Sequence, residues 1–202
     1  MDLKFYFKKQ YEFQVGNIPF LKKKDYNFQI NEIDRLNQVE VSNDLRYMEN
    51  FEECSLDELD RELALQIKSA LTQVFDQTTQ IVSLYLYLPQ DEFRLSKGTY
   101  LCTKTKLIKV TSSNWIEMKS KSKNPGLIIA CKLDKAVILG RRGLVSALKQ
   151  AGALEQILKS NLGVRDKDID SDQALVNFNA LSFDAGLNIN EIIILGFINL
   201  KR

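Results

Sequence analysis

The side chains best suited to chemistry in this sequence are tyrosines, phenylalanines and glutamates in or beside short apolar segments. Histidine is absent from all 202 residues, so the commonest metal ligand and the usual base near neutral pH are missing. The three cysteines, Cys54, Cys102 and Cys131, are far apart, and no CxxC pair occurs. This pattern argues against a zinc site or a disulfide framework, so we expect a reducing cytoplasm, no metal and no cofactor.

The most specific candidates for a binding site are two tyrosines in the segment QIVSLYLYL. Apolar residues there alternate with serine and tyrosine, which predicts a strand over residues 80–88. Tyr85 and Tyr87 then share one face of the strand, and the leucines share the other. We expect helices to cover the leucine face and the two phenol rings to line a ligand cleft. A half-exposed sheet face without a ligand fits the same pattern.

The remaining site candidates are less specific. The segment ALVNFNALSF, residues 174–183, predicts a strand in which Phe178 shares one face with small side chains. Such neighbours suit either a cavity or a tightly packed helix. A carboxylate in a strand is usually solvated, and burial without a cation would raise its pKa. The other candidate aromatic and acidic residues are Tyr47, Trp115, Phe183, Glu117 and Glu191.

Two segments have the periodicity of amphipathic helices. The first is CSLDELDRELALQIKSALTQVF, residues 54–75, where Ser55 and Glu58 have the spacing of a capping box. The second is LVSALKQAGALEQILKSNLG, residues 144–163, which ends at a glycine suited to a helix C-terminus.

Short strands are predicted before and after each helix. Strand, helix and strand pair recur in this order, which favours an α+β fold of two similar halves with antiparallel sheets. The further predicted strands are TYLCTKTKLIKV, NWIEMKS, PGLIIACKL and EIIILGFINL.

Three stretches resemble one known family, in the same order along the chain. FKKQYEFQVGNIPFLKKKDYNFQI resembles the junction between the dimerisation helix and the effector-binding domain of MerR-type multidrug-sensing activators. EMKSKSKNPGLIIACKL resembles the second-half strand of that domain, and SDQALVNFNALSFDAGLNINEIIILGFINL resembles its closing hairpin. From about residue 8 onward the chain is therefore similar to a GyrI-like (SOUL-related) effector-binding domain.

The resemblance implies an architecture and a set of partners. Residues 17–202 would form two pseudo-symmetric βαββ-type halves, about 24–111 and 112–202, around a central cleft for a small lipophilic or aromatic effector. Residues 1–16 would end the linker or dimerisation helix of a homodimeric regulator. DNA would bind only through an N-terminal domain, since no helix-turn-helix with a basic recognition helix is evident in this sequence.

Two other functions of such domains stay open: hydrolysis of small electrophilic compounds by a glutamate and a tyrosine, and sequestration of a protein partner. The glutamate of multidrug-binding members is replaced here by Ala174 or Leu175. A net charge of +2 indicates neither a nucleic-acid nor a membrane partner, and no apolar run has the length of a membrane helix. We therefore predict a cytoplasmic ligand sensor rather than an enzyme.

Overall fold

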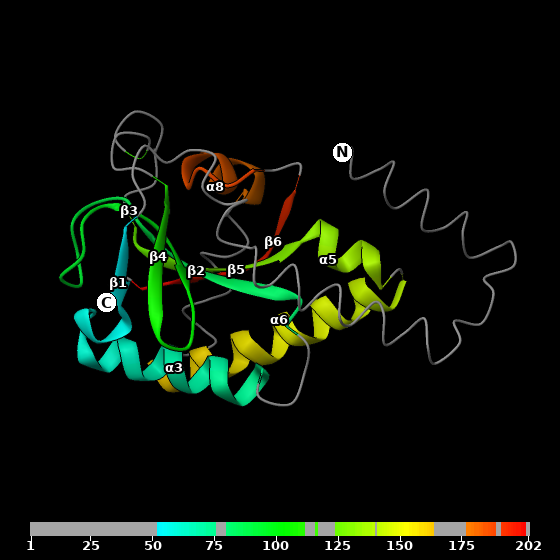
Figure 1. Cartoon of the computed structure of the whole chain (residues 1–202), viewed down its shortest axis with the longest axis horizontal. Helices are drawn as coiled ribbons and strands as arrows, with labels where there is room; N and C mark the ends of the chain where they lie inside the picture. The colour runs from blue at the N-terminus through cyan, green and yellow to red at the C-terminus, as the bar shows by residue number, and fades with distance from the viewer. Residues whose placement is uncertain are drawn as a thin grey trace, which may run out of the picture.

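A computed structural model describes residues 52–75, 80–111, 116, 124–139, 141–163, 177–188 and 191–200. These residues form one six-stranded antiparallel sheet in the order β1-β4-β3-β2-β5-β6 and four α-helices (Figure 1). The strands are β1 (Glu53–Ser55), β2 (Val82–Leu88), β3 (Gly98–Cys102), β4 (Lys106–Thr111), β5 (Gly126–Lys132) and β6 (Ile192–Asn199). The helices are the 3-10 helix η2 (Leu56–Glu58), α3 (Arg61–Phe75), α5 (Leu133–Ile138), α6 (Arg141–Leu162) and α8 (Phe178–Asp184). The predicted α+β class with antiparallel strands is confirmed.

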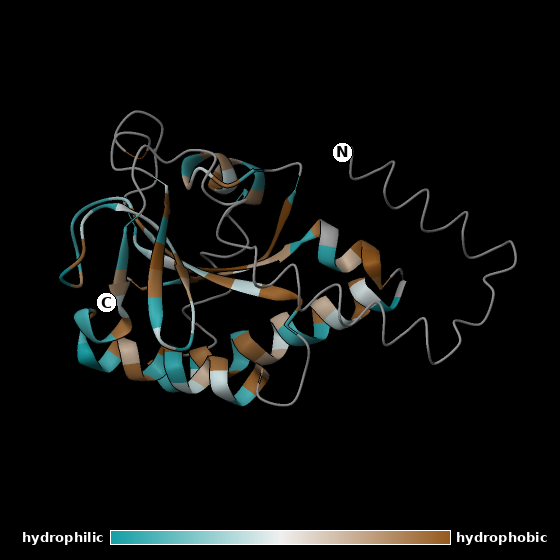
Figure 2. Cartoon of the chain, in the orientation of Figure 1, coloured by the Kyte–Doolittle hydropathy of each residue, from teal (hydrophilic) through white to brown (hydrophobic). Residues whose placement is uncertain are grey.

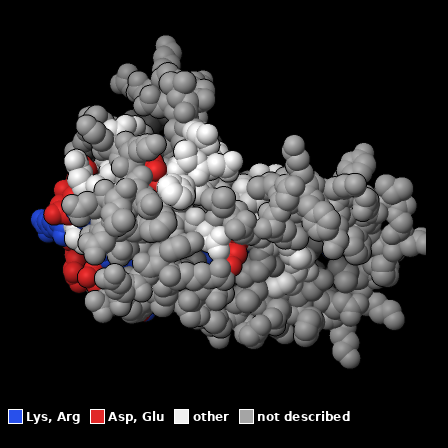
Figure 3. Space-filling model, turned by 90° about the horizontal axis from the view of Figure 1, so that it is seen from above, with Lys and Arg blue, Asp and Glu red and all other residues white. Residues whose placement is uncertain are grey.

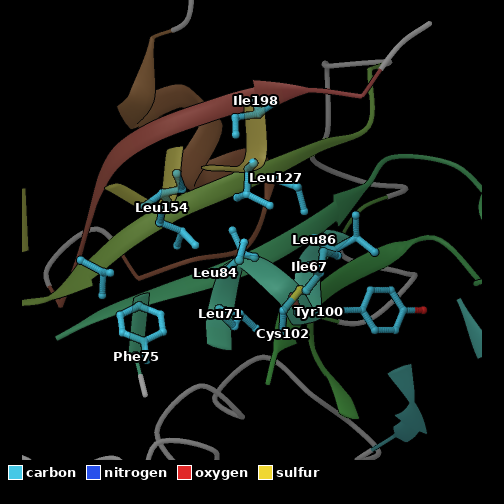
Figure 4. Packing of buried hydrophobic residues seen from close by; sticks show 14 of the residues in the cluster. Ile67, Leu71, Phe75, Leu84, Leu86, Tyr100, Cys102, Leu127, Leu154 and Ile198 are labelled. Carbon is cyan, nitrogen blue, oxygen red and sulfur yellow. The ribbon is translucent and has the colours of Figure 1, made fainter. Parts of the chain in front are cut away.

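Helices cover the leucine face of β2, as predicted, and this face forms the larger core. Helices α3 and α6 lie side by side on this face, while α8 lies on the opposite face (Figure 1). Leu84 of β2 packs among side chains from both helices and from neighbouring strands (Figure 4). In Figure 2 the strands are mostly brown, and teal appears on the outer faces of α3 and α6. Burying each such leucine contributes about 1.5–3 kcal/mol, so this face dominates the stability of the fold.

The first helix begins later than the sequence indicates. Residues from Cys54 onward first form the short edge strand β1 and then the turn η2, and α3 starts only at Arg61. The predicted capping box is present, because Ser55 N donates to Glu58 Oε1 at 3.0 Å, but it caps η2. Asp60 supplies a cap for α3 itself, since its Oδ1 accepts from the N–H of Glu62 at 3.2 Å. Pairing of β1 with β4 keeps these residues out of the helix.

The segment TYLCTKTKLIKV forms a hairpin of β3 and β4 rather than the single strand predicted. The chain reverses at Thr103, whose Oγ1 accepts from the N–H of Lys106 at 3.0 Å. The Thr103 N–H in turn donates to the Lys106 carbonyl at 2.9 Å and closes the turn. Threonine side chains commonly stabilise such turns, so local hydrogen bonding here overrides the strand pattern.

The prediction of a strand over residues 174–183 is wrong for its second part, where the chain forms α8. Asn177 caps this helix, because its Oδ1 accepts from the N–H groups of Asn179 at 3.0 Å and Ala180 at 3.2 Å. Leu181 and Ala185, four residues apart, are then both buried on one side. Capping and this spacing of apolar contacts outweigh the alternation.

Two further boundaries differ around the second long helix. Between the predicted strand PGLIIACKL and the predicted helix the chain forms α5, and α6 begins at Arg141 rather than at residue 144. The end of α6 is as predicted, since Gly163 has φ of +65° and its N–H donates to the Ser160 carbonyl at 3.3 Å. No helix in the described part of the chain combines the length and apolar character needed to cross a bilayer.

Candidate functional site

An aromatic group lies on the sheet face opposite α3 and α6. It consists of Tyr85 and Tyr87 of β2 and Phe197 of β6, which we call the aromatic seam. In the sheet register Tyr85 pairs with Ile128 of β5, and Ile128 pairs with Phe197. The Phe197 ring covers Gly126, the partner of Tyr87, so closely that a Cβ at Gly126 would overlap it. The seam thus runs across β2, β5 and β6.

The described cover over the seam is small. Phe178 packs at the margin of the buried cluster that holds the seam. The cluster includes Leu181 of α8, Ala185 directly after this helix, Leu187 and Ile116. Helix α8 has seven residues, and only Leu181 and Ser182 within it are buried. A helix this short is not stable on its own and depends on its tertiary contacts.

Two threonine hydroxyls fasten α8 to the sheet. Thr99 Oγ1 of β3 donates to the Ala185 carbonyl at 2.8 Å, and Thr111 Oγ1 of β4 donates to the same oxygen at 2.9 Å. Both threonines have no exposed surface. Helix ends leave carbonyls without intrahelical partners, so the two bonds supply what the end of α8 needs. They hold this end over β3 and β4.

The structure brings Tyr85 and Tyr87 together on one face, as predicted, but both are fully buried and do not line an open wall. Phe178 lies next to this cluster on α8 rather than on a strand. Phe183, on the same helix, is 51% exposed and points away from the core. Glu191 is half-buried just before β6, where its carbonyl accepts from the Leu133 N–H at 2.8 Å. Three predicted site residues lie outside the described residues: Tyr47, Trp115 and Glu117.

A polar cluster that sequence reasoning missed lies on the other face of the sheet. Lys109 of β4 is only 5% exposed, and its Nζ lies 2.9 Å from both Glu52 Oε2 and Ser96 Oγ. The ammonium also lies over the Tyr100 ring, 5.8 Å from its centre. We call these four residues the Lys109 cluster. The sequence does contain a signal for this cluster. Lys109 lies two residues after Leu107, so both side chains share the face of β4 that packs against the core.

Burial controls the protonation of the nucleophilic side chains near this cluster. It raises the pKa of Tyr100 to about 12, although the hydrogen bond with Ser96 opposes the shift. Partial burial, followed by the charges of Glu58 and Glu52, raises the pKa of Cys54. Both groups therefore keep their protons at neutral pH, which argues against either as a nucleophile or base.

Cys102 of β3 and Cys131 of β5 are both buried, whereas Cys54 of β1 is half-buried. Burial raises the pKa of Cys102, as expected of a structural thiol. Within the described ranges no group of three or more cysteines and carboxylates is arranged to hold a metal ion. On the face in Figure 3, described acidic and basic side chains gather together at one end. Mixed charge of this kind does not indicate a nucleic-acid interface.

Comparisons with known proteins give no match: no family model matches the sequence, and no curated protein or solved structure is significantly similar to it. The resemblance to a GyrI-like domain therefore stays a prediction. What the described residues define is an α+β protein with one antiparallel sheet, an aromatic seam under a short helix and a buried lysine on the opposite face.

Proposed function

We propose that this chain is a small-molecule sensor domain, of the GyrI-like kind found in MerR-type transcriptional regulators. Its ligand is a lipophilic or aromatic compound that binds against the aromatic seam. The observation that carries the proposal is the pair of adjacent, fully buried tyrosines beneath a seven-residue helix. Leucine or isoleucine fills a core without a polar atom, so two buried tyrosines on one strand face call for a specific role.

The position of the seam fits a site between two halves of the chain. The half over residues 24–111 contributes β1 to β4 to the sheet, and the half over residues 112–202 contributes β5 and β6. The halves meet where β2 pairs with β5, which is where Tyr85 and Tyr87 lie. In the proposal, a compound bound on this line touches both halves and responds to any change in their arrangement.

Ligand entry in this proposal requires α8 to move. The displacement separates the two buried residues of α8 from the sheet and breaks the two threonine bonds at its C-terminal end. Each such bond contributes about 0.5–1.5 kcal/mol net. A planar compound would take the place of Leu181 on the tyrosines and recover apolar burial. The phenol rings also suit a cationic aromatic compound, through cation–π contact.

The sensing step is a shift between two states of α8. A ligand that binds only when α8 is displaced favours that state by its differential affinity, and by no more than that. The outer side of α8, which carries the exposed Phe183, then changes its position. A regulator needs such a displacement of a surface element to pass the signal on.

A direct test is a thermal-shift and calorimetric screen with neutral aromatic dyes and aromatic cations. A true ligand at a hundred times its dissociation constant adds about 2.7 kcal/mol of stability. Tyr85→Leu and Tyr87→Leu should each weaken binding about two- to tenfold, because an aromatic contact contributes roughly 0.5–1.5 kcal/mol beyond its area. Tyr100→Phe, on the opposite face, is the matched control and should bind as the wild type does. Binding that survives both leucine substitutions contradicts the proposed site, and steady consumption of a bound compound would favour the hydrolase.

A further inference from the structure

The Lys109 cluster has the composition of a site for an anion. The lysine side chain is 6% exposed, whereas the side chain of its acidic partner Glu52 is 61% exposed. Ser96, the second oxygen partner, is also exposed. A buried cation thus faces two oxygen ligands that both lie at the surface.

The sheet is shaped around this lysine. Gly98 of β3 leaves room for the side chain, because a Cβ there would lie 2.8 Å from Lys109 Cε. The register of β3 and β4 shifts between Thr99 and Tyr100, which pairs Tyr100 with Lys109. Burying an ammonium group is costly unless an anion and hydrogen bonds compensate it. The lysine position is therefore one that an apolar residue would fill at lower cost, unless the charge has a use.

Among the hydrogen bonds of this cluster, the Ser96 hydroxyl is a donor that can turn toward the strongest acceptor within reach. Lys109 Nζ donates to Ser96 Oγ, and the Tyr100 hydroxyl donates to the Ser96 carbonyl at 2.7 Å. The Ser96 hydroxyl hydrogen then points toward the Tyr100 oxygen, 3.0 Å away. A carboxylate is a stronger acceptor than a neutral phenol, so an incoming carboxylate placed within reach of both Lys109 and Ser96 would accept this hydroxyl.

We propose that the Lys109 cluster is a carboxylate-binding site in which the Glu52 side chain is the exchangeable occupant. An incoming carboxylate replaces Glu52 at Lys109 Nζ and accepts a second hydrogen bond from Ser96. The ligand is the carboxylate of a small organic acid or of a peptide C-terminus. A multiply charged anion such as phosphate is disfavoured, because one lysine balances only one negative charge. The site lies on the sheet face opposite the aromatic seam and does not depend on the function proposed above.

The experiment uses the full chain and chemical rescue. Glu52→Ala removes the internal carboxylate and lowers the melting temperature, because Lys109 loses its partner. Titration with acetate should restore the melting temperature along a saturable curve, while chloride at the same ionic strength should not. Wild-type protein should need more acetate than Glu52→Ala, because the tethered Glu52 carboxylate competes for Lys109 Nζ. The double variant Glu52→Ala with Lys109→Met should show no response to acetate.

Amide NMR shifts distinguish the two ligand sources. They also test the proposal in proteins other than Glu52→Ala, should that variant fail to fold. Acetate should move the Ser96 and Lys97 amide signals in wild-type protein and, at lower concentration, in Glu52→Gln. A short peptide with a free C-terminus should compete with acetate, and its amidated form should not. If small carboxylic acids compete with acetate but the peptide does not, the ligand is a small acid. Absence of a saturable shift in both proteins, or an unchanged response in Lys109→Met, overturns the proposal and leaves a structural ion pair.

Discussion

The attachment of α8 to the sheet gives the sharpest test of this structure. Thr99 and Thr111 come from adjacent strands, and both donate to one carbonyl oxygen, that of Ala185. Replacing each threonine by valine keeps the shape of the side chain and removes only the hydroxyl. The two substitutions should therefore report on one shared acceptor.

The expected loss of stability depends on how many hydroxyl donors the Ala185 carbonyl keeps. After Thr99→Val alone or Thr111→Val alone, Ala185 O keeps one buried donor, and the loss is about 0.5–1.5 kcal/mol. After both, a buried carbonyl loses both hydroxyl donors, and that desolvation penalty adds about 1–3 kcal/mol. The double variant should thus lose more than the sum of the singles, with a coupling of about 1 kcal/mol or more.

Urea unfolding of the four proteins in this cycle measures the coupling, and hydrogen exchange locates it. The α8 amides should exchange faster in the double variant, whereas the amides of α3 should change only with global stability. Thr105→Val, in the exposed β3–β4 turn, is the matched control and should be close to neutral. Strict additivity, or a double variant as stable as the wild type, would refute the shared-acceptor reasoning.

Three other features of the fold give further testable outcomes. Gly143→Ala should destabilise the fold by about 1–3 kcal/mol, measured by urea unfolding, because its Cβ would overlap the Ala136 carbonyl. Gly152→Ala, on the same helix with open space around it, should instead stabilise the fold by about 0.5–1 kcal/mol. The folded-state pKa of Tyr100, about 12, exceeds the 10.0 of an exposed tyrosine, so the unfolded chain releases this proton first and stability falls as pH rises between these values. The loss is at most about 3 kcal/mol, and solvent screening beside the exposed Ser96 makes it smaller. Urea unfolding of wild type and Tyr100→Phe from pH 9 to 12 isolates this loss, and parallel stability curves would contradict the assignment. Native protein should react with a thiol reagent slowly and only at Cys54, with the other two cysteines reacting on unfolding; fast labelling of all three would contradict their burial.

The sequence alone was sufficient for the elements whose pattern is long and regular. Alternation over residues 80–88 places the leucines of β2 on one face and its tyrosines on the other, and the structure has them so. Apolar spacing through α3 and α6, and a glycine at the end of α6, likewise follow from local geometry. The order of these strands and helices along the chain then indicates the α+β class.

Local pattern was insufficient where a short segment fits both a strand and a helix. Residues 178–184 alternate like a strand, yet the Asn177 cap and the two threonines that bind Ala185 O select a helix. Those threonines lie 74 and 86 residues away along the chain, so the sequence pattern around α8 carries no trace of them.

The candidate sites divide in the same way. That Tyr85 and Tyr87 share a face follows from strand periodicity, but their complete burial depends on which elements cover that face. The meeting of Lys109 with Ser96 and Glu52, 13 and 57 residues away, depends on the register of β3 with β4 and of β1 with β4. Periodicity within a strand is a property of consecutive residues, whereas register and cover arise from contacts between distant segments, and only the tertiary structure decides them.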